Sequence, residues 1–163
     1  MDNENSQKDL TLTRTFTLPI ESVWEYWTDQ ELIAKWWGPE GFTTPISTLD
    51  VKPGGKMYLV MEDSHGLIKK GSRYPMTGVF QEIIRPEKIV FTSRAIMNDK
   101  PILENLVTVT FGEENGKTKI TVHVVVTKTT PEAEMSLKGM GMGWSQSLDK
   151  LAKLLGNNDR SIS

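Results

Sequence analysis

Apolar and polar residues alternate along most of the chain between residues 10 and 128. In residues 10–18 the even positions are mainly leucine and phenylalanine, whereas threonine occupies the odd positions. This period of two is typical of a β-strand with one buried face. Six further segments of this kind lie between turn sequences such as Asn115-Gly116, at residues 42–51, 56–62, 74–84, 88–96, 103–111 and 118–128. The pattern predicts antiparallel strands joined by hairpins.

A helical period replaces the alternation only near the C-terminus, in residues 131–155. Apolar or small residues recur there at steps of four and three, at Leu137, Gly141, Trp144, Leu148, Leu151 and Leu155. Thr130 and Pro131 are typical of a helix start, and Gly156 is typical of a helix end. We expect one long amphipathic helix that packs against the sheet, because no other predicted helix is long enough to cover it.

Two shorter helices are predicted between the first two strands. The first covers about residues 20–27 and has its tryptophans on one face. The second covers about residues 29–36, where Thr28 and Glu31 match a capping box and Gly38 precedes a proline that stops the helix. We expect this pair of helices to close one end of the fold, because their tryptophans need an apolar surface.

Together these segments predict an α+β fold in which a curved antiparallel sheet wraps around a long C-terminal helix. Residues 10–156 are expected to form a single domain, because 163 residues suffice for one core and no change in composition divides them. The polar segments 1–9 and 157–163 are expected to be a disordered N-terminus and a polar tail.

The overall charge argues against several classes of partner. The formal net charge is −2 and the sequence pI is about 5.7, which disfavours a nucleic-acid or anionic-membrane surface. The chain has no cysteine, no secretory signal pattern and no apolar run of membrane-spanning length. We expect a cytoplasmic protein without a metal site or bound cofactor.

The sequence offers no recognisable catalytic constellation. No nucleophile elbow, phosphate-binding loop or metal-spaced histidine pair is present. The two histidines are His65, in a polar loop, and His123, on the polar face of its strand, which we expect to face solvent. No catalytic residue is therefore predicted, and binding is favoured over catalysis.

Several short motifs, in this order, resemble one protein superfamily. They are Arg14-Thr15-Phe16, Pro19, Val23-Trp24, Trp27-Thr28, Trp36-Trp37-Gly38-Pro39, Pro53-Gly54-Gly55, Gly78, Phe91-Thr92, Gly143-Trp144, Leu148 and Leu151. The chain resembles the START-like (SRPBCC) superfamily, in the branch related to the C-terminal domain of Aha-type activators of the heat-shock chaperone ATPase. The resemblance implies a helix-grip fold, which agrees with the pattern above.

The resemblance also implies a cavity between sheet and helix, since many members bind apolar or aromatic molecules. Some relatives are cyclases or dehydratases, and the chaperone activators bind a protein partner. Two features depart from the pattern. The helix start carries Gly139, Gly141 and Gly143, and the extra N-terminal domain of the full chaperone activators is absent from the sequence.

If such a cavity exists, twelve residues are the candidates for contact with a ligand: Arg14, Trp36, Trp37, Met57, Leu59, Met61, Met76, Phe91, Met140, Gly141, Trp144 and Ser147. Each has a simpler interpretation. Most are ordinary core residues, Arg14 can pair with a carboxylate, and Ser147 can bond back to the carbonyl of Gly143. The glycines can mark a bend or break in the helix, or they can leave room for a ligand.

Three functions remain open from the sequence. The first is binding of a small apolar or aromatic molecule in an internal cavity. The second is a chaperone-partner or other protein-interaction domain, and the third is an enzyme of the cyclase or dehydratase type that uses Arg14 or a cavity acid.

Overall fold

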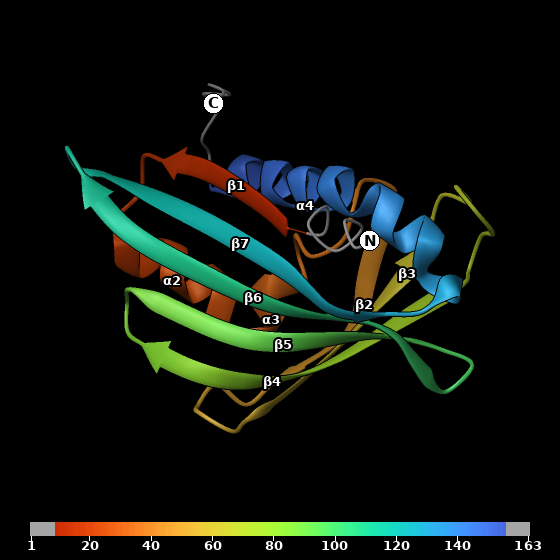
Figure 1. Cartoon of the computed structure of the whole chain (residues 1–163). Helices are drawn as coiled ribbons and strands as arrows, with labels where there is room; N and C mark the ends of the chain where they lie inside the picture. The colour runs from red at the N-terminus through yellow and green to blue at the C-terminus, as the bar shows by residue number, and fades with distance from the viewer. Residues whose placement is uncertain (1–8, 156–163) are drawn as a thin grey trace.

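Seven strands form one antiparallel sheet in a computed structural model that describes residues 9–155 (Figure 1). The strands are β1 (Asp9–Phe16), β2 (Phe42–Leu49), β3 (Lys56–Asp63), β4 (Arg73–Ile84), β5 (Lys88–Met97), β6 (Lys100–Glu114) and β7 (Lys117–Thr129). Their order across the sheet is β1-β7-β6-β5-β4-β3-β2. Each strand from β2 to β7 therefore pairs with its neighbour in sequence, and β1 returns to pair with β7. The predicted run of hairpins is confirmed.

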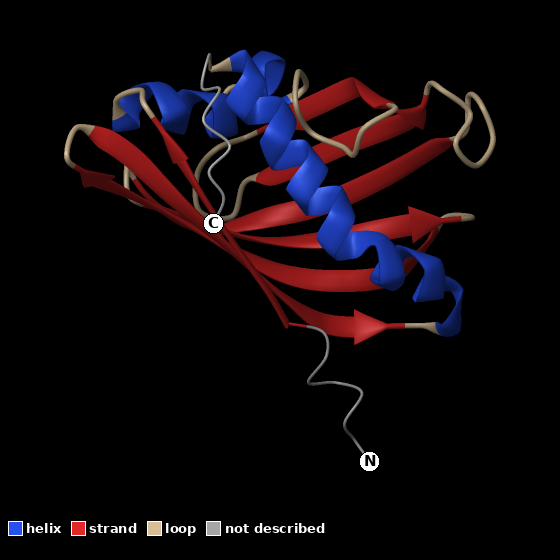
Figure 2. Ribbon diagram, turned by 90° about the horizontal axis from the view of Figure 1, so that it is seen from above, coloured by secondary structure: helices blue, strands red, loops and turns tan. Residues whose placement is uncertain are grey.

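The helices lie on one side of this curved sheet. They are α2 (Ile20–Thr28), α3 (Gln30–Ile33), the 3₁₀ turn η1 (Pro131–Ala133) and α4 (Glu134–Leu154). Helix α4 runs diagonally across the sheet, and α2 and α3 lie at the end where α4 finishes (Figure 2). The α+β helix-grip architecture, with a long C-terminal helix held by a curved sheet, is confirmed.

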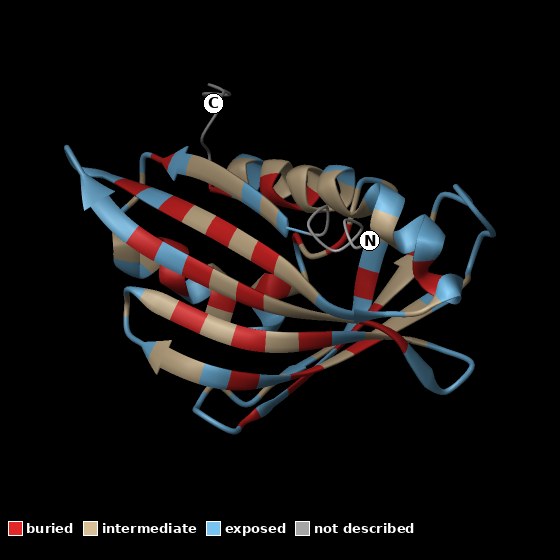
Figure 3. Ribbon diagram, in the orientation of Figure 1, coloured by how far each residue is buried: buried red, intermediate tan, exposed pale blue. Residues whose placement is uncertain are grey.

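The sheet buries one face, as the alternation of buried and exposed bands along β6 and β7 shows (Figure 3). A main apolar cluster joins the inner face to the helices and includes Trp24, Phe91, Val107 and Leu148. A second, smaller cluster consists of Ile102, Leu103 and Ala133, with Ala95, Val126 and Leu137 packed against it. The inner face therefore carries two separate apolar regions.

One predicted helix start is wrong, and another is confirmed in position without the expected side-chain bond. Helix α3 is capped by Asp29, whose carboxylate accepts from the N–H groups of Glu31 and Leu32 at 2.8 and 3.1 Å. The Thr28 hydroxyl instead donates to the Trp24 carbonyl inside α2, because it still lies within that helix. Thr130 holds an N-cap position with Pro131 after it, as predicted, but the turn that begins there is η1, which leads into α4, and the Thr130 hydroxyl donates to the carbonyl of Ile102 instead of capping.

The glycine-rich start of α4 does not break the helix. Helix α4 is continuous through Gly139, Gly141 and Gly143, although each interior glycine costs about 1 kcal/mol relative to alanine. A Cβ atom at Gly139 or Gly143 would have no neighbour within 4 Å, and one at Gly141 would meet only Leu10, at 3.8 Å. Close packing therefore does not require these glycines, and the space beside them is open.

The β3–β4 loop is ordered by one carboxylate. Asp63 is fully enclosed at the end of β3, and it accepts hydrogen bonds of 2.7–2.9 Å from the N–H groups of Leu67, Ile68 and Lys69. Burial by itself would raise the pKa of Asp63, but these backbone donors outweigh it and hold the pKa below its ordinary value. The loop is thereby fixed with Leu67 and Ile68 pointing outward, about two-thirds exposed.

Replacing Asp63 with asparagine should lower the thermal unfolding midpoint at neutral pH and speed amide exchange at residues 67–69. The folded-state pKa is depressed, so this carboxylate stabilises the fold fully above its ordinary pKa, and the stabilisation is lost as pH falls through the lower, folded-state value. The midpoint difference between variant and wild type should therefore shrink in acid. The exposed Asp50→Asn variant is the control, and a difference that is independent of pH would contradict this account.

Candidate functional site

The burial of α4 changes along its length. Leu148 and Leu151 in the C-terminal half are completely buried, whereas Leu137 and Trp144 on the same seam are only half-buried. Met142, two residues before Trp144 and on the outward side of the helix, is 68% exposed. The C-terminal half of the helix is therefore packed on the sheet, and the N-terminal half leaves part of its inward side accessible.

The buried half of α4 is held by the α3–β2 loop, residues 34–41. The Gly38 N–H donates to the Ser147 hydroxyl at 3.1 Å, and that hydroxyl donates to the Gly143 carbonyl at 3.0 Å. The Glu40 N–H donates to the Gln146 side-chain oxygen at 3.0 Å. Ser147 thus makes the bond to Gly143 that the sequence suggested, and it also joins the loop to the helix.

Lys150 completes this attachment. Its ammonium group donates to the carbonyls of Pro39 and Phe42 at 3.4 and 3.2 Å. Burial lowers the pKa of Lys150 below its ordinary value, and nearby Glu40 partly opposes the shift. Three side chains within about one turn of α4, those of Gln146, Ser147 and Lys150, therefore bind consecutive backbone groups of the loop and the first residue of β2.

Tryptophan rings fill the space between the loop, α2 and α4. Trp36 is fully buried, donates its indole N–H to the Tyr26 carbonyl at 2.9 Å, and lies 4.6 Å from the ring of Trp27. Trp37 is half-buried, and its ring centre lies 5.4 Å from that of Trp144 in an edge-to-face arrangement. One of the two adjacent tryptophans is therefore a core residue, and the other lies at the margin of the accessible region.

Aromatic and sulfur-containing side chains continue this margin across the sheet. Phe42, Met61 and Tyr74 share the inner face, since Met61 pairs with Tyr74 and Phe42 pairs with Asp63. All three are half-buried, and the rings of Phe42 and Tyr74 lie 5.9 Å apart. We call the set Trp37, Phe42, Met61, Tyr74 and Trp144, which are four aromatic residues and one methionine, the aromatic rim.

Gly38 lies between α4 and strand β3, the two elements that carry Trp144 and Met61 of the aromatic rim. Its φ of +106° is a left-handed conformation that glycine tolerates, and a Cβ there would lie 3.2 Å from the Met61 sulfur. The same glycine donates to Ser147, so one residue places the loop against both α4 and β3. Phe42 and Tyr74 were not singled out from the sequence, although both occupy the first positions of predicted strands.

The structure places the other candidate ligand residues in two environments. Met57, Leu59, Met76 and Phe91 are buried members of the main apolar cluster. Met140 is half-buried and packs against the main apolar cluster, and Gly141 is half-buried with only Leu10 of β1 beside it. Of the twelve candidates, the structure therefore leaves five apolar or small residues half-buried: Trp37, Met61, Met140, Gly141 and Trp144.

Arg14 joins the edge strand β1 to α4. Its guanidinium donates to the Ser145 hydroxyl at 2.9 Å and lies 3.5 Å from the carboxylate of Asp149. It also donates to the carbonyl of Thr13. The pairing with a carboxylate, which the sequence left open, is the arrangement in this structure, and neither Ser145 nor Asp149 was identified beforehand.

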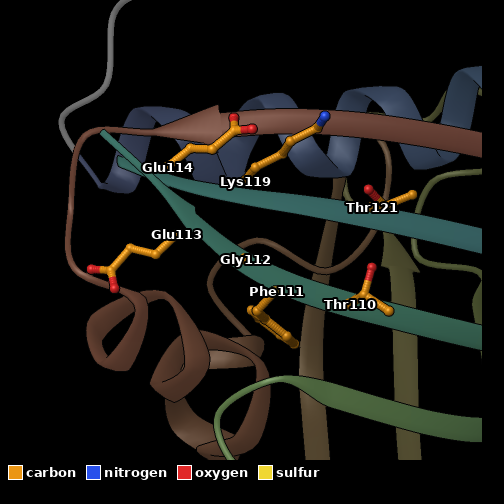
Figure 4. Close-up of a pocket in the computed structure, with 7 residues that line it drawn as sticks. All are labelled: Thr110, Phe111, Gly112, Glu113, Glu114, Lys119 and Thr121. Carbon is orange, nitrogen blue, oxygen red and sulfur yellow. The ribbon is translucent and has the colours of Figure 1, made fainter. Parts of the chain in front are cut away.

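Two open hollows are lined by residues 9–155, and neither includes a residue of α4. One, of about 330 Å³, lies on the outer face of the β6–β7 hairpin beside Thr110, Lys119 and Thr121 (Figure 4). The other, of about 510 Å³, lies between the start of α2 and the β4–β5 turn. The half-buried residues under α4 therefore line neither of these hollows.

Other candidate chemistry is sparse in the part of the chain that the structure describes. Within residues 9–155 no three histidine, aspartate or glutamate side chains gather as metal ligands would. His123 faces outward, is 44% exposed, and lies 2.7 Å from the Asp9 carboxylate. None of the helices in this range is long and apolar enough to cross a membrane.

Comparison with known proteins gives a family match over most of the chain. The family model described as Activator of Hsp90 ATPase homolog 1-like protein matches residues 17–156. No curated protein matches.

Solved structures share the fold over nearly the whole length. A protein from Nitrosomonas europaea is 27% identical with a TM-score of 0.74, covering 93% of this chain and 96% of that one. An AHSA1 protein from Silicibacter pomeroyi is 28% identical with a TM-score of 0.73, covering 91% and 97%. DynU16, encoded in the dynemicin biosynthetic locus, shares the fold at 17% identity and a TM-score of 0.64, covering 91% of this chain and 47% of its own.

Replacing Ser147 with alanine should lower the free energy of unfolding by about 1–3 kcal/mol, because the buried Gly38 N–H loses its acceptor. Chemical denaturation measures the change. Ser136→Ala, at an exposed position of the same helix, is the matched control and should be neutral or slightly stabilising, since alanine favours helices. Equal effects of the two substitutions would contradict the attachment of the loop through Ser147.

Proposed function

The chain belongs to the Activator of Hsp90 ATPase homolog 1-like family, and from this premise we propose that it binds a small apolar or aromatic molecule between the sheet and the N-terminal half of α4. The observation that carries the proposal is the half-burial of the aromatic rim on the inner side of the grip. Apolar side chains that stay accessible inside a fold are favourable contacts for an apolar ligand.

The shape and chemistry of the rim favour a flat ligand. Trp37 and Trp144 present edges and faces at one side, and Phe42 and Tyr74 do so at the other. Planar molecules stack on such rings, and the flexible side chains of Met61 and Met140 can adapt to their outline. Gly141 and Gly143, both half-buried, add no side chains to the adjoining surface of α4.

The expected affinity is moderate. Burying about 300 Å² of apolar surface at roughly 25 cal/mol per Å² gives about 7 kcal/mol before the cost of immobilising the ligand. Dissociation constants in the micromolar range follow if a few polar contacts contribute. Arg14 is a candidate contact only at the edge of this region, because its guanidinium is engaged by Ser145 and Asp149.

A protein-partner function is the second candidate, and exposed apolar side chains favour it. Leu67 and Ile68 on the β3–β4 loop, and Met135 and Met142 on α4, are 65–76% exposed. The loop and the start of α4 lie at the same end of the molecule, opposite α2 (Figures 1 and 2). A chaperone or another protein could contact these side chains without entering the grip.

Tryptophan fluorescence titrated with flavonoid-like and fatty-acid-like compounds tests the first candidate, because Trp37 and Trp144 line the proposed site. We expect saturable quenching in the micromolar range. Gly141→Leu should weaken binding at least tenfold by filling space beside Leu10, whereas Gly139→Leu, which points to solvent, should leave it unchanged. Absence of both quenching and thermal shift across the panel at tens of micromolar would put the protein-partner function first.

A further inference from the structure

A polar pair interrupts the inner face of the sheet between its two apolar clusters. Ser93 on β5 and Asn105 on β6 are directly opposite each other. On β6, Asn105 lies between Leu103 of the second cluster and Val107 of the main cluster, and all three share one face in the alternation. On β5, Ser93 lies in the same way between Ala95 and Phe91.

The same boundary between clusters occurs on α4. Leu137 packs with the second cluster, and Met140 packs with the main cluster. Gly141, which follows Met140 and is half-buried, adds no side chain at this boundary. The boundary between the two clusters is therefore marked on the sheet by the polar pair and on α4 by the step from Leu137 to Met140.

The hydrogen bonding of Asn105 is incomplete. Its side-chain nitrogen lies 3.5 Å from the Ser93 hydroxyl oxygen, at the limit of a hydrogen bond, and its side-chain oxygen is buried with no partner. A buried amide oxygen without a donor costs about 1–3 kcal/mol, so an apolar residue would serve the core better at this position. Asn105 as a whole is only half-buried, so part of this residue remains accessible.

The other buried polar atom without a partner differs in its surroundings. Within residues 9–155 it is the indole N–H of Trp27, a residue only 2% exposed. The ring centres of Trp36, Phe111 and Trp144 lie 4.6–6.4 Å from that of Trp27, and aromatic faces accept weakly from N–H groups. Trp27 thus has a packing explanation that Asn105 lacks.

We propose that Asn105, supported by Ser93, is the polar anchor of the ligand site and selects ligands that carry a hydroxyl group, such as phenols. The inference rests on the proposed function, since it names the ligand class for the same region. Rotation of the amide by 180° exchanges its oxygen and nitrogen, and a hydroxyl satisfies either atom because it both donates and accepts. An ether or a bare ring leaves at least one orientation unsatisfied.

Three probes of the same ring system test the selection: naphthalene, 2-naphthol and 2-methoxynaphthalene. Burial of apolar area alone predicts that naphthalene binds at least as tightly as 2-naphthol. Because a net hydrogen bond amounts to about one factor of ten in affinity, the proposal predicts that 2-naphthol binds roughly five- to tenfold more tightly than either other probe. Tryptophan quenching with the three probes gives the ratio.

Asn105→Leu should reduce this ratio to about one while naphthalene binding is kept or improved, because leucine has a similar size and no polar atom. Thr108→Val, which removes a hydroxyl from the outer face of the same strand, is the control and should leave the ratio unchanged. The side-chain amide resonances of Asn105 in the unaltered protein give a second readout that does not depend on the variant folding. They should shift with 2-naphthol and not with naphthalene.

The outcomes separate the two proposals. If none of the three probes binds, the proposed function fails. If all three bind with equal affinity and the Asn105 amide does not respond, the site exists and the assignment of Asn105 is overturned.

Discussion

The hydrogen bond from the Gly38 N–H to the Ser147 hydroxyl is the contact on which the arrangement of the grip depends. It joins the α3–β2 loop to α4 at the point where the helix changes from half-buried to buried. Gln146 and Lys150 bind the same loop on either side of Ser147. The Gly38–Ser147 bond lies out of water, so both groups must keep their partners, and with the more exposed bonds of Gln146 and Lys150 it sets the position of α4 over the sheet.

A helix held mainly through one half leaves the other half less constrained. The N-terminal part of α4 contacts the sheet through Leu137, Met140 and Trp144, while its three glycines contribute no side chains. The inner face below it keeps half-buried aromatic residues and one polar pair rather than a closed core. The same constraint that organises the packed end therefore accounts for the accessible end, where both proposals place the ligand.

The fold could be predicted from the sequence because its signals are local and repeated: alternation in the strands, Asn115-Gly116 at a hairpin, and one long amphipathic helix. Details set by contacts between distant segments could not. The alternation marked Arg14 as a charge on an apolar face, but its partner Asp149 is 135 residues away. Asn105 and Ser93 acquire meaning only through the β5–β6 register, and Asp29 rather than Thr28 caps α3 because α2 extends one residue further than expected.

Residue-resolved amide hydrogen exchange along α4 tests most directly the claim that this helix is held mainly in its C-terminal half. The account predicts that amides of residues 148–154 exchange at rates close to those of global unfolding, whereas amides of residues 138–143 exchange orders of magnitude faster. Uniform protection along the whole helix would contradict it. The accessible half of the grip would then be as rigidly packed as the rest of the core.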